Sequence, residues 1–369
     1  MLHGLHVFSN LYSRQKMTGQ TDEHFEINQS PKEKKTKFLV IRFSSIGDIV
    51  LTSPVVRCLK KQVSGAEIHY LIKPQFKMVM EPNPYIDKLH VLQQDWEKMI
   101  TELKAEDFDY IIDLHHNLRT LRVKKALQKP AFSFNKLNVE KFIFTKFKWN
   151  VMPDVHVVDR YMETVASFGV KNDGEGLDYF IPEKERVPIS DIPASHHAGY
   201  IAVVIGASYY TKKLPVPKLQ ELCRQIQHPI ILLGAKEERE EGEAIASVDP
   251  IKIYNACGKF SLHESVDLTR QSKLVIAHDT GLLHIAAALK KQVIAVWGST
   301  TPSLGVEPYY GARYLQAHHH PFDNVQVLKL WCRPCTKFGK NKCPQGHFKC
   351  MRNISIDEIV ADVERRLRR

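Results

Sequence analysis

The sequence predicts an α/β protein built from two Rossmann-like, doubly wound domains that face a central cleft. Three observations predict this fold class. Short apolar segments alternate with segments of helical periodicity, the alternation occurs twice, and a region rich in glycine, proline and charge separates the two series. A chain of 369 residues is long enough for two domains, and an apolar content of 43% can supply two cores.

The first predicted domain, residues 37–169, follows a polar, lysine-ending stretch, residues 1–36, that is predicted to be a flexible extension. Strands are expected at 38–43, 67–72, 87–92 and 108–114, and helices at 48–63, 96–105 and 156–168. These strand segments are apolar nearly throughout, as expected for a parallel sheet that helices cover on both faces.

Residues 170–198 are the predicted linker, because they combine several glycines and prolines with many charges and few long apolar runs. The second predicted domain, residues 199–353, repeats the alternation. Its strands are expected at 199–205, 229–233, 251–254, 273–277 and 292–297, and its helices at 217–227, 236–247, 261–271 and 281–289. The last segment, residues 354–369, has the amphipathic pattern of a helix.

The most informative motif, KLVIAHDTGLLHIAAA at residues 273–288, passes from a buried strand through Asp279-Thr280-Gly281 into a helix. A helix start offers unpaired N–H groups and a positive dipole end, which suit a phosphate or diphosphate. Thr280 adds a hydroxyl, Gly281 lets the backbone approach a ligand, and His284 can face the same anion one turn on. The alternative is that Asp279 is only an N-cap and His284 an ordinary helix residue.

A second motif, KFLVIRFSSIGDIVLTSP at residues 37–54, again joins a strand to a helix through a short turn. Ligands of open α/β sheets bind at this carboxyl edge. Gly47 permits a tight turn there, and Asp48 is placed where its carboxylate can face the cleft. The alternative is that Asp48 is an N-cap, which is the commoner role for an aspartate at a helix start.

Together these motifs resemble the heptosyltransferases of glycosyltransferase family nine, which build the inner core of lipopolysaccharide. The matching segments occur in the order SSIGD at 44–48, GASYYTKKLP at 206–215 and DTGLLHIAAA at 279–288. The resemblance extends from residue 37 to the C-terminus. It implies the GT-B architecture, in which the final helix often packs back on the first domain. It also implies transfer of a heptose from a nucleotide diphosphate to a sugar hydroxyl.

The resemblance assigns Asp48 as the general base that takes the acceptor proton, and Lys212 as the cation that stabilises the diphosphate leaving group. A base benefits from a raised pKa, whereas a helix start lowers it, so partial burial of Asp48 must compensate. Lys213 is the alternative to Lys212, and two adjacent loop lysines are also commonly just solvated. The expected reaction inverts the anomeric centre. The resemblance also implies that it requires no metal cofactor.

Most of the remaining site residues are predicted from their places at the sheet edges and the helix starts, whereas Glu237 resembles the family's nucleoside-ribose contact. The donor, expected to be an ADP-sugar, is predicted to contact Ser208, Lys213, Glu237, Asp279, Thr280, Gly281, Leu282 and His284. Glu238 stays an alternative to Glu237. The acceptor, a lipid A or inner-core precursor, is predicted to contact Ser45, Gly47, His115 and Arg119. Arg119 would pair with a carboxylate or phosphate of an acidic sugar.

A formal net charge of +11 predicts an anionic partner. Residues 118–150 contain nine Lys or Arg against one Glu, with phenylalanines and a tryptophan interleaved. This composition suits an anionic membrane surface, and the alternative is a solvated basic helix whose aromatic side chains face the core. The sequence contains neither a secretory signal nor an apolar run of about 18 residues. We therefore expect a cytoplasmic protein, peripheral at the inner face of the cytoplasmic membrane.

Four of the seven cysteines cluster near the C-terminus, at Cys332, Cys335, Cys343 and Cys350. They form a candidate structural zinc site, although the spacing lacks a second C-x2-C pair, so reduced packing thiols are the alternative. Three other functions compete with the heptosyltransferase hypothesis. These are transfer from another nucleotide sugar such as an N-acetylglucosamine donor, nucleotide-sugar epimerisation, and nucleic-acid binding. The sequence has no nucleic-acid-binding motif, so no nucleic-acid partner is expected.

Overall fold

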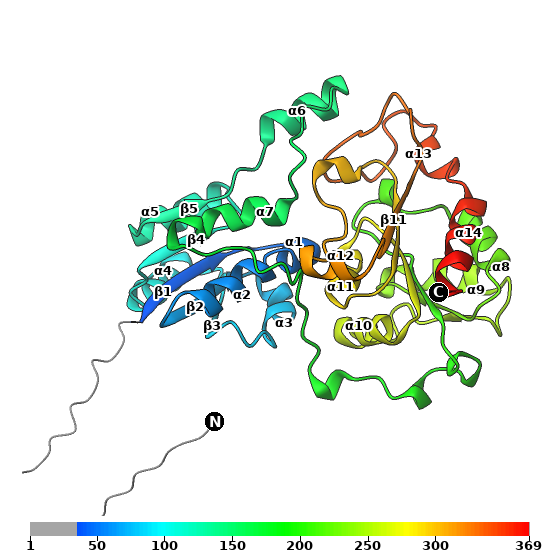
Figure 1. Ribbon diagram of the computed structural model, residues 1–369, viewed down its shortest axis with the longest axis horizontal. Helices are drawn as coiled ribbons and strands as arrows, with labels where there is room; N and C mark the ends of the chain where they lie inside the picture. The colour runs from blue at the N-terminus through cyan, green and yellow to red at the C-terminus, as the bar shows by residue number, and fades with distance from the viewer. Residues whose placement is uncertain (1–34, 369) are drawn as a thin grey trace, which may run out of the picture. The chain divides into compact units, whose positions relative to one another are not determined.

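A computed structural model describes residues 35–368 of the protein. The predicted extension, residues 1–36, lies outside the described residues except for its last two, and Thr36 already belongs to the first strand. The described chain contains two parallel sheets with helices packed around them (Figure 1). The fold class predicted from the alternation of apolar and helical segments is therefore confirmed, whereas the exact domain limits stay predictions.

The first sheet has the strand order β3-β2-β1-β4-β5, and all its pairs are parallel. Its strands are β1 (Thr36–Ile41), β2 (Ala66–Ile72), β3 (Lys88–Val91), β4 (Tyr110–Asp113) and β5 (Ala131–Ser133). The associated helices are α1 (Ile46–Val50), α2 (Ser53–Gln62), α3 (Lys77–Met80), α4 (Trp96–Ala105), α5 (Leu118–Leu127), α6 (Asn138–Phe147) and α7 (Val157–Met162). The central strand β1 places the turn that follows it at the middle of the sheet edge.

The second sheet has the order β11-β10-β9-β6-β7-β8 and is also parallel. Its strands are β6 (Ile201–Val204), β7 (Ile230–Leu233), β8 (Ile253–Asn255), β9 (Leu274–His278), β10 (Val293–Trp297) and β11 (Phe322–Gln326). The helices are α8 (Val216–Gln225), α9 (Arg239–Ala246), α10 (Leu262–Gln271), α11 (Gly281–Ala288), α12 (Ala312–Ala317), α13 (Lys349–Arg352) and α14 (Ile356–Leu367). The edge strands β5 and β11 were not predicted, because both are short and only partly buried.

The helix predicted at 48–63 is in fact two helices, α1 and α2. The break falls at Thr52, the N-cap of α2, and Pro54 occupies the first turn of that helix. Proline has no N–H group to continue the hydrogen-bond ladder of a preceding helix, but it fits the first turn of a new one. The short α1 is thereby free to take its own direction from the turn after β1.

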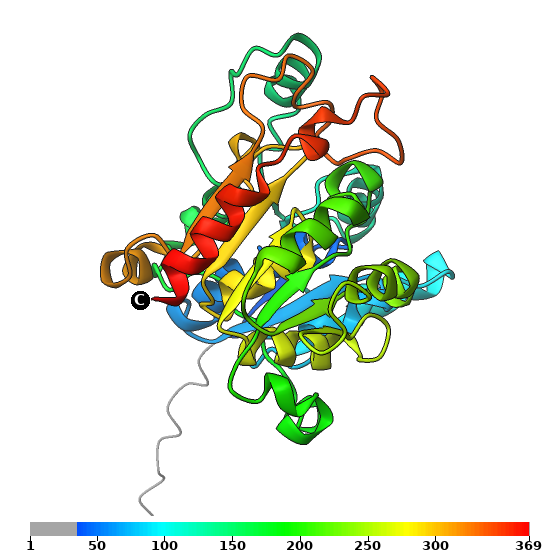
Figure 2. The ribbon, with the colours of Figure 1, turned by 90° about the vertical axis from the view of Figure 1, so that its right-hand side faces the viewer.

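The C-terminal helix α14 packs on the second sheet, not on the first domain as the resemblance suggested (Figure 2). Its apolar stripe, Ile356, Ile359 and Val363, is buried in the core formed by β6, β7, β9 and β10. Arg366 extends this contact by donating from Nε to the carboxylate of Asp323 on β11 at 3.1 Å. The expectation was wrong because the unpaired apolar face nearest to the end of the chain belongs to the second domain.

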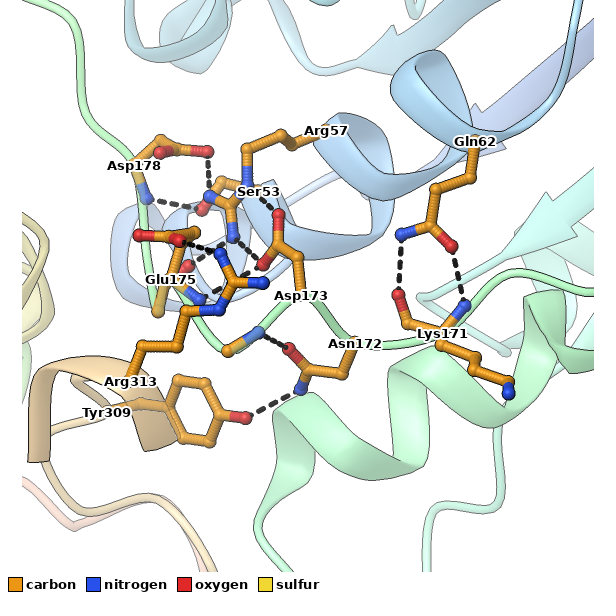
Figure 3. A network of polar contacts seen from close by, with 12 residues as sticks. Ser53, Arg57, Gln62, Lys171, Asn172, Asp173, Glu175, Asp178, Tyr309 and Arg313 are labelled. Atoms are coloured by element: carbon orange, nitrogen blue, oxygen red, sulfur yellow. Dashed lines mark hydrogen bonds and ion pairs between the residues drawn. The ribbon is translucent and has the colours of Figure 1, made fainter. Parts of the chain in front are cut away.

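The predicted linker has no α-helix or strand, in agreement with its composition, but it is firmly tied to both neighbouring regions (Figure 3). Arg57 on α2 forms a bidentate pair with Asp173, with donor–acceptor distances of 2.7 and 2.8 Å. On the other side, Arg313 on α12 pairs with Glu175 at 2.6 Å. Arg57 is almost fully buried and also pairs with Asp178, so two carboxylates of the linker compensate its charge.

Candidate active site

The N-termini of α1 and α11 meet at two glycines, one in each predicted ligand-binding turn (Figure 1). A Cβ atom on Gly47 would lie 2.6 Å from Cδ2 of His284, and one on Gly281 would lie 2.9 Å from Cγ2 of Ile46. Neither distance leaves room for a side chain. The sequence suggested a tight turn at Gly47 and a ligand approach at Gly281. The structure instead gives both glycines a role in bringing the two helices together.

Asp48 begins α1, and its side chain is 40% exposed. Its Oδ2 accepts hydrogen bonds from the hydroxyl and the N–H group of Ser45 and pairs with Nη2 of Arg42 at 2.9 Å. Burial would raise the pKa of Asp48, but the Arg42 charge and the Ser45 hydrogen bonds outweigh it, so the pKa lies below its usual value. The raised pKa expected for this carboxylate is therefore not found.

Arg42 is a site residue that the sequence did not single out. It directly follows β1, and its guanidinium donates to the carbonyl oxygen of Leu114 at 2.6 Å and to the hydroxyl of Tyr161 at 3.0 Å. These contacts fix the cation beneath Asp48. The only sequence signal was its place at the carboxyl end of a central strand, next to the turn that carries Asp48.

Asp279, at the end of β9, holds Lys212 in place. Nζ of Lys212 lies 2.7 Å from Oδ2 of Asp279, and the same oxygen accepts a hydrogen bond from Oγ1 of Thr300 at 2.7 Å. Both charged side chains are mostly buried, with 13% and 11% of their surface exposed. Asp279 is thus a partner for this lysine and not an N-cap, and Thr300 is an addition from the turn after β10.

The N-terminus of α11 carries no side-chain cap. Thr280 is the N-cap residue, but its hydroxyl makes no capping hydrogen bond, and Gly281 and Leu282 follow in the first turn. An uncapped first turn leaves N–H groups available to an anion, and the helix dipole adds to the attraction. The structure therefore keeps open the phosphate-binding role predicted for this turn.

His284 lies in the centre of this arrangement and is 5% exposed. Burial lowers the pKa of His284, while the nearby carboxylates of Asp279 and Asp48 oppose this effect and the charge of Lys212 adds to it. Nδ1 of His284 is buried and has no hydrogen-bond partner within the described part of the chain. The ring is consequently neutral, with one nitrogen free to contact a bound ligand.

Lys212 and Lys213 point in different directions. Nζ of Lys213 pairs with Glu241 at 2.6 Å and with Glu238 at 3.4 Å, away from Asp279. His278, the last residue of β9, fixes the segment that follows the two lysines. Its buried Nε2 accepts a hydrogen bond from the N–H group of Leu214 at 3.0 Å. The sequence did not single out His278, although it ends the strand before the DTG motif.

The other residues predicted to bind the donor differ in their exposure and contacts. Glu238 faces Gly206 at the end of β6, where a Cβ atom would lie 3.1 Å from its carboxylate. Glu237 is exposed, whereas Glu238 accepts a hydrogen bond from the N–H group of Ala235 and pairs with Lys213, so the prediction between the two stays open. Ser208 is also exposed, on the loop between β6 and Lys212.

On the predicted acceptor side, His115 and Arg119 differ. The His115 ring packs against Phe43 with centroids 5.0 Å apart, and burial together with the charge of Arg42 lowers the pKa of His115 to about 4. Arg119 lies exposed on α5, and its guanidinium has no hydrogen bond or ion pair with any described residue. His115 is therefore part of the Asp48 surroundings, whereas Arg119 is not brought into contact with them.

Four other basic residues form a cationic cluster beside Asp48, namely Lys136, Lys141, Arg160 and Lys337. Burial and the charges of Arg160 and Lys337 lower the pKa of Lys141 to about 8, and Asp48 opposes this effect. Burial and the charges of Arg42 and Lys337 also lower the pKa of Lys136. None of the four forms an ion pair with a carboxylate in the part of the chain that the structure describes.

Arg160 is the most deeply placed member of this cluster, at 2% exposure. Its Nη1 donates to the carbonyl oxygen of Asn135 at 3.1 Å, but Nε and Nη2 are buried without a partner among the described residues. A buried guanidinium with free donors is costly unless an anion binds it. Lys136 and Lys141 belong to the basic region 118–150 noted in the sequence, but their meeting with Arg160 of α7 and Lys337 of the loop after β11 was not predicted, because these residues are distant along the chain.

Helix α6 and the residues just after it carry an exposed aromatic patch, formed by Phe142, Phe147 and Trp149. These side chains are 58%, 53% and 70% exposed, and their rings contact one another in sequence. The alternative that the aromatic residues of this region face the core holds for Phe144 but not for these three. No helix in residues 35–368 is long and apolar enough to cross a bilayer.

The four C-terminal cysteines are reduced and lie in one region with His347. Sγ of Cys332 is 3.7 Å from Nε2 of His347, and the thiol of Cys335 donates to the carbonyl oxygen of Cys332 at 3.1 Å. Burial raises the pKa of Cys350 to about 12, with contributions from Cys335, Cys343 and Cys332. Their ligand atoms do not converge as a set of three within 4.8 Å of one another.

Comparison with known proteins links this geometry to one family. The family model described as glycosyltransferase family 9 (heptosyltransferase) matches residues 96–331, which is more than half of the chain. Lipopolysaccharide heptosyltransferase 1 of Campylobacter coli is 26% identical over 288 residues, covering 72% of this chain and 84% of that protein. Lipooligosaccharide heptosyltransferase 2 of Campylobacter jejuni is 26% identical over 341 residues, covering 88% and 96%.

Solved structures agree in fold. A glycosyltransferase of family 9 from Veillonella parvula superposes with a TM-score of 0.68 at 20% identity, over 90% of this chain and 97% of that chain. The E. coli heptosyltransferase WaaC with ADP gives a TM-score of 0.64 at 19% identity, over 90% and 100%. The two-sheet architecture predicted from the sequence is therefore that of solved heptosyltransferases.

Proposed function

Because the chain belongs to glycosyltransferase family 9, the heptosyltransferase family, we propose that it transfers a heptose from ADP-heptose to a sugar hydroxyl of a lipopolysaccharide inner-core precursor. The observation that carries this proposal is the arrangement around His284. The Asp48 carboxylate and the Lys212–Asp279 pair both lie within electrostatic reach of this ring, which belongs to the helix whose N-terminus is free. The carboxylate can accept a proton, and the lysine with the helix start can hold a diphosphate.

Asp48 acts as the general base in this proposal. Its lowered pKa keeps the carboxylate ionised at neutral pH but makes it a weak base. A weak base can still accept the proton if transfer is late, because an acceptor hydroxyl becomes strongly acidic once its oxygen bonds to the anomeric carbon. The Arg42 pair and the two hydrogen bonds from Ser45 fix the carboxylate in one position, which is the geometric requirement for this step.

Lys212 and the first turn of α11 stabilise the leaving diphosphate. The C–O bond to the anomeric carbon breaks, and the electron pair stays on the diphosphate oxygen. Lys212 is oriented by Asp279, and the N–H groups after Thr280 point along the helix dipole, so both are organised before the substrate binds. His284 offers a hydrogen bond from a neutral ring.

Direct attack by the acceptor from the Asp48 side predicts inversion at the anomeric carbon. In this proposal the positive charge that the diphosphate needs comes from Lys212 and the α11 dipole, so no metal cofactor is required. Treatment with EDTA should leave the transfer rate unchanged, and NMR of the product should show the inverted linkage. A strict requirement for added Mg²⁺ or Mn²⁺ would contradict the proposed charge balance.

We propose that the cationic cluster binds the acidic groups of the acceptor, in place of Arg119. Lys141 lies within the electrostatic influence of Lys136 and Arg160. Both lysines also lie within that of Asp48. Carboxylates or phosphates of an inner-core sugar supply the anions that these groups lack within the protein.

The acceptor subsite can be tested with Lys141→Ala, with Lys125→Ala on α5 as a matched, exposed control. The Lys141 variant should raise the KM for an acidic acceptor by about tenfold, the value of one charge-assisted contact. Its affinity for ADP should be unchanged. Equal KM values for the two variants would contradict the assignment of the cluster to the acceptor.

We further propose that the aromatic patch on α6 docks the enzyme on the cytoplasmic face of an anionic membrane. Three exposed rings stand beside Lys146 and Lys148, a combination that suits the interface of a bilayer with acidic lipids. Cosedimentation with vesicles that contain phosphatidylglycerol should fall several-fold in a Phe142→Ser/Trp149→Ser variant. Equal binding of wild type and variant would contradict this docking surface.

A structural zinc at Cys332, Cys335, Cys343 and Cys350 is proposed on their proximity and on the C-x2-C pair. In this proposal the ion draws the thiols together from their present spacing, and His347 is a substitute ligand. Metal analysis of freshly purified protein should find about one equivalent of zinc. Less than a tenth of an equivalent would contradict the proposal.

The donor is the first property to measure. A thermal-shift comparison of ADP, UDP, GDP and NAD should show stabilisation by ADP, because a ligand at a hundredfold excess over its Kd stabilises the native state by about 2.7 kcal/mol. A shift with UDP alone would favour another nucleotide sugar, such as an N-acetylglucosamine donor. Salt-dependent retention of DNA or RNA, with no shift from any nucleotide, would instead favour nucleic-acid binding.

A further inference from the structure

A group of metal-ligand side chains lies in the first domain, apart from the candidate active site. His69 is on β2, His90 is on the edge strand β3 and Glu106 follows α4, so three separate segments contribute. One ligand atom from each lies within 4.8 Å of the other two, and within residues 35–368 this is the group of His, Cys, Asp or Glu that meets this condition. The proposed transfer reaction uses none of these residues.

The spacing of the three atoms is close to that of a metal-ligand set. Nδ1 of His69 is 2.9 Å from Nε2 of His90 and 3.8 Å from Oε2 of Glu106. Zn²⁺ with ligand distances of about 2.0–2.1 Å in a tetrahedral arrangement separates its ligand atoms by about 3.3 Å. The His69–His90 and His69–Glu106 separations would therefore need to change by only about half an ångström to accommodate an ion, and the His90 and Glu106 ligand atoms lie within 4.8 Å of each other.

The surroundings orient all three ligands. Oε1 of Glu67 accepts a hydrogen bond from Nε2 of His69 at 2.9 Å, which turns the Nδ1 lone pair toward His90. Histidine ligands of zinc typically donate their other N–H group to a carboxylate in this way. Lys88 pairs with Oε1 of Glu106 and leaves its Oε2 free. The carboxylate behind His69 is thus a second observation that points to a cation.

The ring positions are also restricted. The Phe108 ring packs edge-on against the imidazoles of His69 and His90, with centroid distances of 5.2 and 6.0 Å. His69 is 1% exposed, so its ring cannot easily turn away. Without a metal ion, the proton on Nε2 of His90 can bridge the two rings. An ion would replace that proton, which would move to Nδ1 of His90.

We propose that His69, His90 and Glu106 bind a divalent transition-metal ion such as Zn²⁺, with water as the fourth ligand. The ligand set of two imidazoles and one carboxylate suits this class of ion better than Mg²⁺ or Ca²⁺, which prefer oxygen ligands. The ion would link the edge strand β3 to β2 and to the segment after α4. Its role is structural, because it secures the edge of the first sheet.

The test uses the full-length protein after chelation and dialysis, with Co²⁺ as a spectroscopic probe and Zn²⁺ in calorimetric titrations. Wild type should bind one Co²⁺ at this site with visible d–d absorption, whereas any Co²⁺ at the C-terminal cysteines is recognised separately by its thiolate charge-transfer band. The variant His90→Ala should lose this absorption and one equivalent of Zn²⁺. His319→Ala removes an exposed histidine outside the cluster and should bind like wild type.

A third variant tests the orienting carboxylate. Glu67→Gln should weaken Zn²⁺ binding at this site by about 10–100-fold, as for other partners of metal-bound histidines. Circular dichroism and the ADP-induced thermal shift should be the same in all variants, which shows that they fold. Identical metal stoichiometry and affinity in wild type and His90→Ala would overturn the proposal, as would wild type that takes up no metal without thiolate character.

Discussion

The turn after β1 and the turn after β9 are built alike but present opposite electrostatic surfaces. Each joins a central parallel strand to a helix, and each packs a glycine against the other helix. At α1 the Asp48 carboxylate lies over the helix start, where it accepts from Ser45 and Arg42. At α11 the corresponding carboxylate, Asp279, turns away to Lys212 and leaves the helix start uncapped.

The strand–turn–helix motif therefore does not fix its chemistry. At α1 the first turn carries a carboxylate held by Ser45 and Arg42, which suits acceptance of a proton from a hydroxyl. At α11 the neighbouring lysine adds positive charge to the N–H groups of the helix start, which suits a diphosphate. The direction in which each aspartate turns, decided by a basic partner from another segment, separates the two roles.

The largest effect is expected at the turn after β1. Asp48→Asn keeps the shape of the side chain but removes the base, so kcat should fall by about 10²–10⁴-fold. ADP affinity, measured by calorimetry, should be unchanged because the donor lies at the other turn. Ser45→Ala retains the carboxylate and serves as the control with a smaller effect. Near-normal turnover of Asp48→Asn would remove the contrast between the two turns.

A smaller effect is expected at the turn after β9. Lys212→Ala should lower kcat by about 10²–10³-fold, the usual cost of losing one pre-oriented charge in the transition state, and should weaken ADP binding. Lys213→Ala is the matched control, because its ammonium group pairs with Glu241 and Glu238 instead. If both variants lost activity equally, the different directions of the two lysines would have no functional meaning.

The contact between the turns can be tested through stability. Gly281→Ala places a methyl group 2.9 Å from Ile46 and should lower the free energy of unfolding by about 1–3 kcal/mol, the usual cost of overpacking. Urea denaturation measures this loss. Gly206→Ala is the control, since its methyl group would meet only the flexible end of Glu238 at 3.1 Å. If Gly281→Ala left the free energy of unfolding unchanged, the two helices could separate at no cost.

The smallest effect concerns pH. Burial keeps His284 neutral and the Arg42 pair keeps Asp48 ionised, so kcat/KM should be flat between about pH 6 and 8. Lys141, with a pKa near 8, is protonated below that pH and loses its charge above it. The acceptor KM should therefore rise above about pH 8 in wild type but not in Lys141→Ala. A midpoint near pH 6.5 would instead indicate a titrating His284.

The same pKa directions bear on stability. The pKa of Asp48 is lower in the folded chain than in the unfolded chain. Its contribution to folding is therefore present above the unfolded value of about 3.9 and is lost as the pH falls through the folded value. Asp48→Asn lacks this contribution at every pH. Its acid denaturation should begin at a higher pH than that of wild type if other carboxylates drive the unfolding transition. We therefore expect the loss of the Asp48 charge to change acid stability less than it changes kcat.

Local pattern was sufficient for the fold because both sheets are buried on both faces. The runs at 38–43 and 273–277 are apolar at nearly every position, and Asp48 and Asp279 follow them after a few residues. Elements that depend on distant partners were less predictable. Strand β5 has only three residues, β11 is partly polar, and the position of α14 depended on which sheet left an apolar face uncovered.

By itself the sequence determined which residues stand at the two sheet edges, because the end of each apolar strand places the next side chains there whatever their partners. It determined Asp48, the DTG turn and the lysine pair in this way. The folded chain was needed to see the pairing of Asp48 with Arg42, the pairing of Lys212 and not Lys213 with Asp279, and the assembly of Arg160 with Lys136, Lys141 and Lys337. These properties arise from charges that meet in space from distant segments, and no local spacing encodes such meetings.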